Sequence, residues 1–568
     1  MKASETTLRN LLEGGKQFQI PLFQRPYSWQ KEHWETLWGD LMKIYNDEVK
    51  GSYFLGPIVT QAELGTADGI TPFVVVDGQQ RLTTLSILLA SLRTFLKKVD
   101  KQISEQINEF YLINKYQKGD EFYKILPTQD DCDVYKSLIN NKSIKDIKKG
   151  GQIYDAYKFF DSKLKKPDPE EEIELDYLKL KNIVLECLVL VNITTDSSDN
   201  PYLIFESLNN KGEDLSQADL VRNYLFMNLP KEKREDVYNN DWLPLQNSFK
   251  QKMEKLYAKE LTNAFWFYLR KDGESISEKS VYQTIKKRFD VFKNDNKKFY
   301  EELKKLIQFA YYYLRLNFPE NEPEYSLKQR HERLKRLDFT TCHIFLLNIY
   351  HDYETNKISL DDFKEIIDIL ESYFVRRWLC KISTRALSQI FDNLYKQIIE
   401  SKPDNLVSGL RSVLISYTGN KVFPDDILFC QALIEEQLYN SKSSTANDRV
   451  KFLLENIEKT LSKEQVITKE LTIEHVMPQT LTQPWKNMLG TSHMSIKTKW
   501  LHTLGNLTLT AYNAELSNKP FDEKVKYFTN KSNVSLNKYF HKLEMWNEEE
   551  IKKRGKYLAN IAIKRWSR

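Results

Sequence analysis

Residues 73–89 read FVVVDGQQRLTTLSILL, and a strand pattern changes to a helix pattern within this stretch. The apolar run Phe73 to Val76 predicts a buried strand, and Leu82 to Leu89 have the apolar spacing of a helix. Asp77 to Arg81 lie between the two and would form a tight loop. The sequence therefore predicts a strand, a turn and a helix in direct succession.

A loop of this kind suits a phosphate, because free N–H groups and the positive end of the following helix point at whatever lies above it. Gly78 allows close approach to the backbone, and Arg81 offers a two-pronged contact to phosphate oxygens. Asp77 could hold a metal ion or polarise water, and Thr83 and Thr84 supply hydroxyl groups. The same pattern also occurs as plain architecture, so the loop alone leaves both interpretations open.

Further strands are predicted on both sides of this loop. Tyr53 to Val59 and Leu188 to Ile193 have the composition of buried strands, and the chain between about 90 and 186 is largely helical in pattern. Ser216 is expected to cap a helix, with Asp219 three residues further on. The first part of the chain therefore combines predicted strands with predicted helices.

The middle of the chain has a different character. Residues 231–435 are long aromatic and charged segments with helical periodicity and few glycines, which we interpret as a helical scaffold. The polar segment 439–448, YNSKSSTAND, predicts a linker or loop before a C-terminal unit. A chain of 568 residues is long enough for about three or four folding units.

Charge and cysteine content bear on the partners and on the cellular compartment expected for this protein. The 84 basic and 79 acidic side chains nearly cancel, so only local clusters bear on nucleic acid. One basic cluster runs from Lys552 to Arg568, and a solvated helix face and a phosphate contact surface are both open there. Five cysteines without a CxxC pair are expected to be reduced thiols. Without a signal core or an apolar span, we expect a cytoplasmic protein with no membrane partner.

A second chemical pattern lies near the C-terminus, at Ile473 to Gln479, IEHVMPQ. Metal-dependent nuclease chemistry needs a hard oxygen ligand such as Glu474, a neutral imidazole such as His475 as general base, and a further oxygen ligand such as an Asn amide. Glu474 and His475 are adjacent, so on a strand they project to opposite faces unless the chain turns, and Pro478 favours a turn. Leu504 to Asn513, LGNLTLTAYN, predicts a turn, a second strand and the start of a helix.

Three separated N-terminal motifs, IPLFQRPYSW at 20–29, FLGPIV at 54–59 and VDGQQRLTTL at 76–85, resemble the N-terminal domain of GmrSD-type modification-dependent restriction endonucleases. The resemblance implies a ParB/sulfiredoxin-like α/β domain that binds and hydrolyses a nucleoside triphosphate (GTP, ATP or another) through the DGQQR loop. Phe205 to Gly212, with Asp219, Arg222 and Asn223, resembles a later family signature that would complete the same pocket. The residues implied to bind the nucleotide are Gln24, Arg25, Asp77, Gly78, Gln79, Gln80, Arg81, Thr83 and Thr84, with Asp77 and Arg81 in catalytic roles.

Several of these positions also have a structural interpretation. Gln24 and Arg25 could instead be a buried polar pair that fixes the loop before Pro26. Tyr27, Trp29 and Trp34 are expected in the core, because aromatic residues mostly bury area.

The C-terminal motifs EHxxPQ, LGNLTL and NxxLSNxxFxxK resemble the HNH nuclease domain of the same family. The resemblance implies a ββα-metal fold that holds Mg²⁺ or Mn²⁺. His475 becomes the general base and Asn506 orients it, while Glu474 and Asn513 become metal ligands. Glu474 stands where many HNH sites have Asp. Lys519 and Lys524 are implied to contact phosphate.

Three further C-terminal residues have expected roles in the site or in the core. His502 is interpreted as an extra ligand or as a hydrogen-bonded structural histidine. Trp485 and Trp500 are expected in the core.

Together these observations predict an α+β multidomain protein that is predominantly helical. The expected domains are 1–230, the DGQQR nucleotide-binding domain, 231–435, a helical spacer, and 436–568, an HNH-type nuclease. The expected function is type IV-like restriction of foreign, modified double-stranded DNA in anti-phage defence, regulated by the nucleotide. The alternatives are a nucleotide-switched DNA clamp that does not cleave and an abortive-infection nuclease toxin. The oligomeric state stays open, with a homodimer among the alternatives.

Overall fold

The computed structural model describes residues 2–63, 69–141, 151–167, 175–195, 216–252, 256–462 and 466–568. The described chain is mostly helical, with one mixed six-stranded sheet near the N-terminus and a small hairpin near the C-terminus. It divides into two compact units, Met1–Thr262 with Tyr282–Lys304, and Asn263–Val281 with Lys305–Arg568. Each unit is described by itself.

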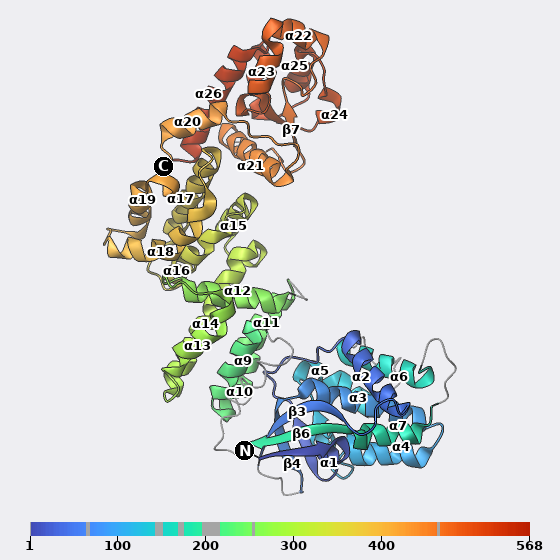
Figure 1. Ribbon diagram of the computed structural model, residues 1–568. Coiled ribbons are helices and arrows are strands. Elements are labelled where there is room, and N and C mark those ends of the chain that lie inside the picture. Colours follow the sequence, from blue (N-terminus) through green and yellow to red (C-terminus); the bar gives the residue numbers. More distant parts are fainter. Residues whose placement is uncertain are drawn as a thin grey trace. The chain divides into compact units, whose positions relative to one another are not determined.

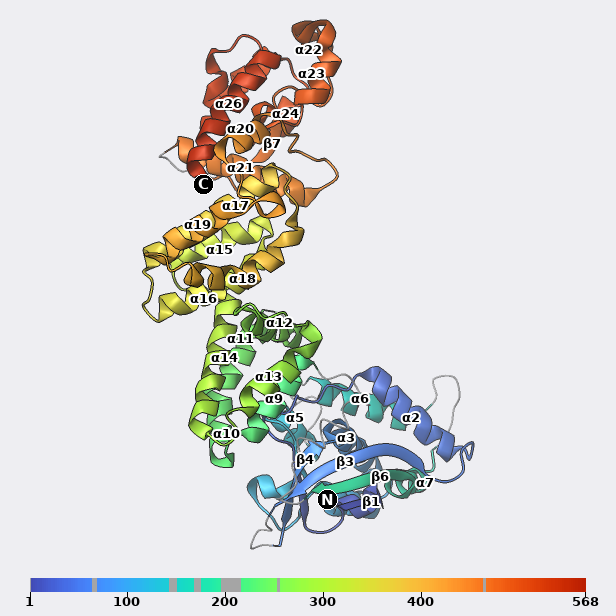
Figure 2. The ribbon, with the colours of Figure 1, turned by 60° about the vertical axis from the view of Figure 1, so that its left-hand side comes forward.

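The first unit is built around the sheet, whose strand order is β1-β6-β3-β4-β2-β5. β3 runs parallel to β6 and antiparallel to β4, while β4 runs parallel to β2. Figures 1 and 2 show β3 and β6 side by side, with α3 beside the sheet. The strands are β1 (Lys2–Thr7), β2 (Lys16–Gln19), β3 (Tyr53–Ala62), β4 (Thr71–Asp77), β5 (Ile125–Leu126) and β6 (Leu188–Thr195).

Helix α3 is the central helix of this unit. Most of its residues are buried, and its apolar side chains join those of α2 and α6 in one core. The helices that belong to the unit are α1 (Leu8–Leu12), α2 (Lys31–Tyr45), α3 (Gln79–Leu96), α4 (Lys101–Ile107), α5 (Gln129–Ile139), α6 (Gln152–Lys165), α7 (Tyr177–Asn182), α9 (Gln217–Asn228), α10 (Lys231–Val237) and α11 (Leu243–Lys250).

Helices α12 (Tyr257–Arg270), α13 (Val281–Asp290) and α14 (Asn296–Asn317) cross the boundaries of the division. The second unit continues with α15 (Tyr325–Leu337), α16 (His343–Glu354), α17 (Leu360–Leu379), α18 (Leu387–Glu400), α19 (Leu406–Ser416), α20 (Asp426–Glu435), α21 (Ser444–Leu461), β7 (Thr472–His475), α22 (Gln483–Leu489), α23 (His493–Trp500), β8 (Leu507–Thr510), α24 (Asn513–Leu516), α25 (Phe521–Asn530) and α26 (Glu548–Arg565).

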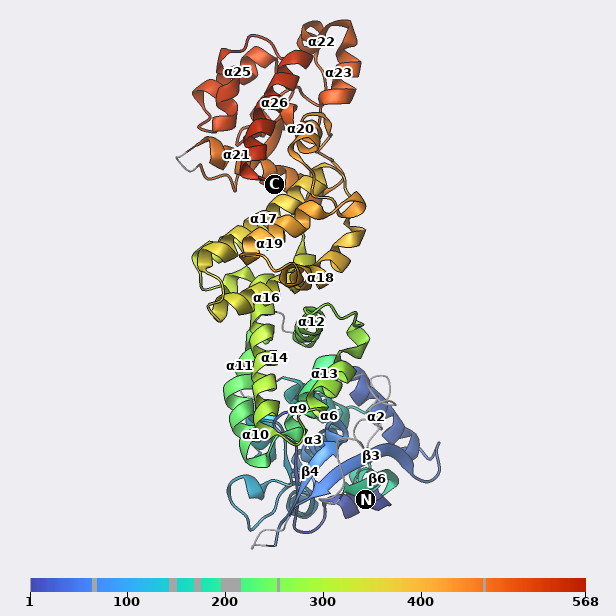
Figure 3. The ribbon, with the colours of Figure 1, turned by 90° about the vertical axis from the view of Figure 1, so that its left-hand side faces the viewer.

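The C-terminal hairpin is held by helices on several sides. β7 and β8 pair antiparallel, with His475 opposite Leu507 and Thr472 opposite Thr510. α21 and α26 lie next to each other, as Figure 3 shows, and α26 also packs on α20 and on the turn before β8. A core that includes Trp485 and Trp500 lies under this arrangement, as the sequence predicts.

The local expectations mostly agree with the structure. β3, β4 and β6 occupy the predicted strands, and the Ser216 side chain accepts a hydrogen bond from the Asp219 N–H at 3.1 Å as the expected cap of α9. The predicted linker 439–448 is wrong in its second half, since α21 begins at Ser444. Ser443 caps that helix by accepting from the Ala446 N–H. The signature Phe205 to Gly212 lies outside the described residues.

Candidate functional site

The DGQQR loop connects β4 to α3 through a glycine whose backbone is left-handed. Gly78 has φ of +90°, and a Cβ added there would lie 3.0 Å from the Pro57 carbonyl oxygen. The side chain of Arg81 also lies at this point of the loop. The Arg81 guanidinium donates to the same Pro57 carbonyl, and it lies 4.0 Å from the Asp77 carboxylate. The loop is therefore packed tightly against β3 by backbone contacts.

The glutamines of the two N-terminal motifs hold one another's loops. The Gln24 side chain is buried and donates to the carbonyls of Val75 at 2.8 Å and Val76 at 3.1 Å. The Gln80 side chain accepts from the Ser28 N–H at 2.8 Å, and Gln79 donates to the Arg25 carbonyl. These amides attach the segment 24–28 to the strand and helix beside it. For Gln24 this geometry corresponds to the structural interpretation.

Thr83 and Thr84 are buried on α3 and point into the unit. The Thr84 hydroxyl lies 2.7 Å from the Tyr27 hydroxyl, which in turn accepts from the Trp34 indole at 2.8 Å. Tyr27 and Trp34 are core residues as expected, and Trp29 packs partly against the same core. Among the predicted nucleotide contacts, those that keep partial exposure are Arg25, Asp77, Gln79 and Arg81.

Asp77 is the titratable group of this loop with an altered pKa. Burial raises its pKa, while Arg81, the Gly78 N–H and Arg25 act in the opposite direction. Burial therefore disfavours the charged form of the Asp77 carboxyl, and the guanidinium groups of Arg81 and Arg25 favour it. Such a group combines burial with specific charge partners, which is typical of functional sites and of structural ion pairs alike.

The residues of α9 form a separate buried cluster in the same unit. Asp219 pairs with Arg222 at 2.8 Å, and Arg222 also donates to the Gln246 side chain at 3.0 Å. Asn223 is buried beside them. The Asp219–Arg222 pair lies within α9, and the Arg222–Gln246 hydrogen bond joins α9 to α11.

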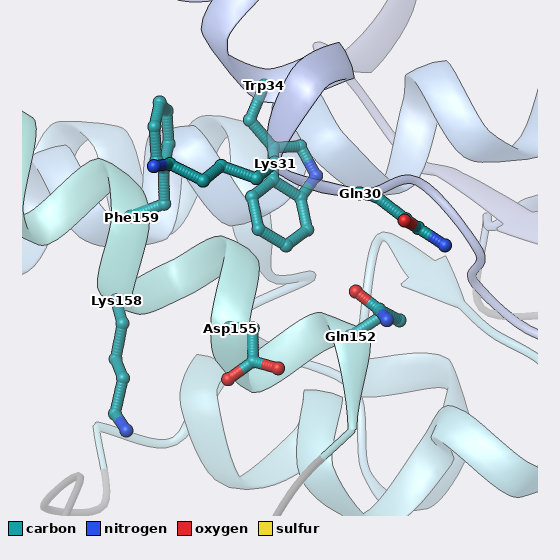
Figure 4. A pocket seen from close by; sticks show the side chains of 7 residues that line it. All are labelled: Gln30, Lys31, Trp34, Gln152, Asp155, Lys158 and Phe159. Carbon is teal, nitrogen blue, oxygen red and sulfur yellow. The ribbon is translucent and has the colours of Figure 1, made fainter.

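A surface hollow of about 500 Å³ lies at the beginnings of α2 and α6. Figure 4 shows the Trp34 ring between the two helices, with the side chains of Gln30 and Gln152 at one end. Lys31, Asp155, Lys158 and Phe159 complete the lining. None of the predicted nucleotide contacts lines it, so the hollow and the DGQQR loop are distinct places in the fold.

In the second unit, Glu474 of β7 forms a buried ion pair with Lys524 of α25. The Lys524 amine lies 2.6 Å from Glu474 Oε1 and also donates to the His475 carbonyl at 2.9 Å. Burial raises the pKa of Glu474 and lowers that of Lys524, and each partner opposes the shift of the other. The sequence predicts a phosphate contact for Lys524, but the side chain is fully buried here and its charge faces Glu474.

His475 projects into different surroundings from its neighbour Glu474. Its Nε2 lies 3.0 Å from Nδ1 of His502, and the Tyr439 ring packs edge-on against His475 and stacks on His502. Burial lowers the pKa of His475 to about 3, with His502 and Lys524 adding to the effect. The two imidazoles and the tyrosine therefore form one cluster, with His475 neutral at physiological pH.

Asn506 holds the chain immediately after His475. Its side-chain oxygen accepts from the Met477 N–H at 2.7 Å and from the Trp546 indole at 3.0 Å, and its amide nitrogen donates to the Met477 and Leu501 carbonyls. The Asn506 carbonyl accepts from the Val476 N–H. Asn506 is fully buried, and its side-chain hydrogen bonds to Met477, Leu501 and Trp546 position the turn after the histidine through the backbone.

The two remaining predicted residues lie after β8, Asn513 at the start of α24 and Lys519 between α24 and α25. Asn513 is exposed at the start of α24 and donates to the Ile473 carbonyl at 3.2 Å, one residue before Glu474. The Lys519 amine lies 3.6 Å from Glu523 and is partly exposed. Within the described residues, no group of three or more His, Cys, Asp or Glu side chains is arranged to hold a metal ion.

Comparison with known protein families places these motifs in context. Residues 8–226 match the family model described as the GmrSD restriction endonuclease N-terminal domain. Residues 426–561 match the one described as the GmrSD restriction endonucleases C-terminal domain. The two matches together cover more than half of the chain. The chain belongs to the GmrSD restriction endonuclease family.

The GmrSD family is described as a family of restriction endonucleases. The chain is also similar to an uncharacterized protein of Methanocaldococcus jannaschii. The two are 26% identical over 254 residues, which cover 39% of this chain and 41% of that protein. The chain thus spans about two fifths of that relative's length. Among the described residues of this GmrSD protein, no helix is long and apolar enough to cross a membrane.

Sequence reasoning missed some of the residues that shape the GmrSD C-terminal site. Tyr439 falls in the segment predicted as a linker, and the only signal for it is an aromatic ring in a polar stretch. Arg554 belongs to the basic cluster near the chain end, but it is fully buried and donates to the carbonyls of Gly505 and Leu507. A single arginine in a charged helix gives no sign of such a role.

The rest of the basic cluster is partly neutralised. Lys552 pairs with Glu548, Lys553 with Glu549 and Glu550, and Arg565 with Glu371. The cluster therefore includes ion pairs on the helix surface and the buried Arg554, and it does not form a continuous surface of unpaired cations.

Proposed function

We propose that this GmrSD-family protein is a type IV-like restriction endonuclease that hydrolyses phosphodiesters of foreign, modified double-stranded DNA in anti-phage defence. Nucleoside triphosphate binding and hydrolysis at residues 1–230 regulates a nuclease formed by residues 436–568, and residues 231–435 act as a helical spacer. The family membership supports the nuclease, and the contacts around His475 support its assignment as the reacting group.

The observation that carries the proposal is the contact between the buried His475 imidazole and the partly exposed His502 imidazole. A general base must be unprotonated before it can take a proton from water, and burial keeps His475 in that form by lowering its pKa to about 3. The negative phosphates of bound DNA would favour the protonated imidazole and so make His475 a stronger base than it is in the free protein.

His502 decides which nitrogen of His475 is available. The 3.0 Å contact between His475 Nε2 and His502 Nδ1 needs one proton between them. If His475 supplies it, its Nδ1 keeps a free lone pair, and no hydrogen bond within the described chain occupies that atom. The proposed reaction requires this tautomer, with His502 as acceptor and the attacking water at His475 Nδ1.

The donors near the hairpin agree in type with a hard divalent cation. Mg²⁺ accepts one or two oxygen ligands from protein and fills its other positions with water and substrate phosphate. The Glu474 carboxylate and the Asn513 amide oxygen would supply those ligands, and the Asn513 amide is already fixed beside β7 by the Ile473 carbonyl. A bound Mg²⁺ or Mn²⁺ would stabilise the charge that develops on the phosphate.

Lys524 and Asn506 support the same site from inside the protein. Lys524 balances the Glu474 charge and binds the His475 carbonyl, so it keeps the strand end in place. Asn506 fixes the following turn. Lys519, which is partly exposed two residues before α25, remains the candidate for a phosphate contact.

In the N-terminal domain, the nucleotide contacts are proposed at the four partly exposed residues Arg25, Asp77, Gln79 and Arg81. Gln24, Gln80, Thr83 and Thr84 would then act by holding this surface in shape, since all four side chains are buried and those of Gln24, Gln80 and Thr84 form hydrogen bonds within the fold. Gly78 would provide the close backbone approach that a phosphate needs.

The proposal is tested by cleavage of unmodified, hydroxymethylated, glucosylated and phosphorothioated DNA with Mg²⁺ or Mn²⁺, with and without nucleotide. We expect cleavage of at least one modified DNA, and a loss of about 10²- to 10⁴-fold for His475→Ala. The matched control is His493→Ala, because His493 is a partly exposed histidine of the same unit. Equal activity of wild type and His475→Ala would refute the assignment.

The same experiment separates the alternatives. A clamp would bind DNA and turn over nucleotide without cutting any of the four substrates. A toxin would cut unmodified DNA as well, and its expression without phage would harm the host unless His475 is replaced.

A further inference from the structure

A second hollow, of about 370 Å³, lies in the helical part of the second unit, away from the hairpin residues described above. It is bordered by the end of α17, the short turn before α18, and α21. Its volume falls within the range of about 300–1,000 Å³ that is common for sites that bind small molecules. Neither family model covers residues 374–387, which supply most of its lining.

The charge of this lining is one-sided. Arg377, Lys381, Arg385 and Arg449 all line the hollow, and none of its lining residues is Asp or Glu. Two of the four cations have a carboxylate nearby: Lys381 pairs with Glu436, and Arg449 lies 3.9 Å from Asp338. The hollow therefore has an excess of positive charge.

The other two cations have no carboxylate partner in the described part of the chain. The Arg377 guanidinium is buried and donates to the carbonyls of Val422, Ser383 and Asn420, so its hydrogen bonds are satisfied but its charge is not balanced. The Arg385 side chain is exposed at the rim. A buried, unbalanced cation next to an exposed one attracts an anion, because the interior screens charge poorly.

Aromatic rings form the apolar part of the hollow. Phe339 and Phe374 stack with ring centroids 4.0 Å apart and an interplanar angle of 7°, and the Arg449 guanidinium lies over the Phe339 ring at 5.3 Å. Trp378 is partly exposed beside them. Stacking surfaces next to arginines are the usual means of holding nucleic acid bases without reading their sequence.

We propose that this hollow binds a nucleotide unit, with the base against Trp378 and the phosphate at Arg385 and its cationic neighbours. The ligand is either a free nucleotide or one nucleotide of a DNA strand, since both carry a planar base and a phosphate. The site is separate from the DGQQR loop and does not depend on cleavage at His475. It gives the helical middle of the chain a binding role in addition to its role as a scaffold.

The test uses the full-length protein in EDTA, so that cleavage does not interfere. Three probes are titrated: ATP and GTP by calorimetry, a fluorescein-labelled single-stranded oligodeoxynucleotide by anisotropy, and tripolyphosphate as an anion without a base. The variants are Arg385→Glu and, as a control with the same charge change, Lys402→Glu. Lys402 is exposed beyond the far end of α18, roughly 20 Å from Arg385 along a helix of 14 residues.

We expect Arg385→Glu to weaken at least one nucleotide probe about tenfold, which corresponds to the loss of one stacked or charge-assisted contact. Lys402→Glu should stay within about twofold of wild type. Loss of one of two ATP or GTP sites identifies a free nucleotide, and loss of oligonucleotide affinity alone identifies a strand. Equal behaviour of the two charge variants on every probe refutes the proposal.

A third variant tests the base. Trp378→Leu removes the ring but keeps an apolar side chain, so it should weaken the nucleotide probe and leave tripolyphosphate binding unchanged. If tripolyphosphate weakens equally, or binds as tightly as the nucleotide to wild type, the hollow is an anion site and the proposed base contact is wrong. Thermal unfolding of each variant checks that it folds, and Arg385→Glu decides the case if Trp378→Leu does not fold.

Discussion

The DGQQR loop and the C-terminal hairpin carry motifs of the same family, yet their polar residues are used differently. Around the loop, Gln24, Gln80 and Arg81 bind backbone carbonyls and N–H groups, and their side chains hold neighbouring segments together. Around the hairpin, His475, Glu474 and Lys524 bind one another or other ionisable side chains. The loop is held mainly by neutral hydrogen bonds and the hairpin by groups that can gain or lose a proton.

This difference separates scaffold from chemistry within each motif. The Gln24 amide nitrogen donates to two strand carbonyls and has no N–H left for a ligand, whereas an imidazole held neutral by burial is ready to accept a proton. In the loop, the partly exposed Asp77 and Arg81 are the better candidates for chemistry. In the hairpin the best candidate is His475, although it is almost fully buried.

The largest expected effect lies in the hairpin, at the buried ion pair. Lys524→Met leaves the Glu474 carboxylate buried without its partner, which we expect to destabilise the second unit by about 3–5 kcal/mol. The urea midpoint measures this. The double variant Glu474→Gln with Lys524→Met should recover most of the loss, because it buries neither charge. A double variant as unstable as the single one would contradict this account of the pair.

The second prediction uses pH to distinguish the two regions. The pKa of His475 lies at about 3 in the folded protein and near 6.5 in the unfolded chain. Between these values the unfolded chain binds the proton and the folded one does not, so stability falls as pH drops from 6.5 toward 3. His475→Phe should reduce this slope by up to about 1.4 kcal/mol per pH unit, measured by urea unfolding at several pH values.

The control for this prediction is Gln24→Leu in the loop. It should lower stability without changing the slope, since the Gln24 amide does not titrate. His331 and His343, which burial also shifts to a pKa of about 3, contribute the same background to both variants. A slope unchanged by His475→Phe would show that the hairpin is no more acid-sensitive than the loop.

The third prediction concerns the loop backbone. Gly78→Ala places a side chain at φ of +90° and brings its Cβ to 3.0 Å from the Pro57 carbonyl oxygen. A left-handed backbone costs an L-residue about 1–2 kcal/mol, and the contact adds to it. Thermal unfolding of the first unit should therefore shift downward, while Gly39→Ala in α2, where a Cβ has open space, should not lower it. Equal effects of the two changes would mean that the turn is not under this constraint.

The sequence predicted more of the local structure than of the contacts. β4, the turn at Gly78 and α3 follow from a clear change of period, and β8 lies within the segment 504–513, for which the sequence predicts a turn, a second strand and the start of a helix. The ion pair of Glu474 could not be predicted, because Lys524 lies fifty residues further along the chain and its sequence context is that of a surface lysine. Tyr439 and His502 are brought to His475 by the bridge between Gln437 and Thr503, a pairing that no local pattern signals.

The smallest expected effect belongs to His502, which acts on the hairpin histidine through a single hydrogen bond. In the proposed mechanism it accepts the His475 Nε2 proton and so leaves Nδ1 free. His502→Phe keeps a ring against Tyr439 but removes the acceptor, and we expect kcat to fall about tenfold with KM nearly unchanged, which corresponds to one lost hydrogen bond. His502→Asn restores an acceptor and should recover part of kcat.

The ¹⁵N shifts of His475 report its tautomer directly, and the proposed one must dominate in wild type and become mixed in His502→Phe. Equal losses in both variants with an unchanged tautomer would reduce His502 to a packing residue. The hairpin would then be held as the DGQQR loop is, by contacts that shape it without tuning its chemistry.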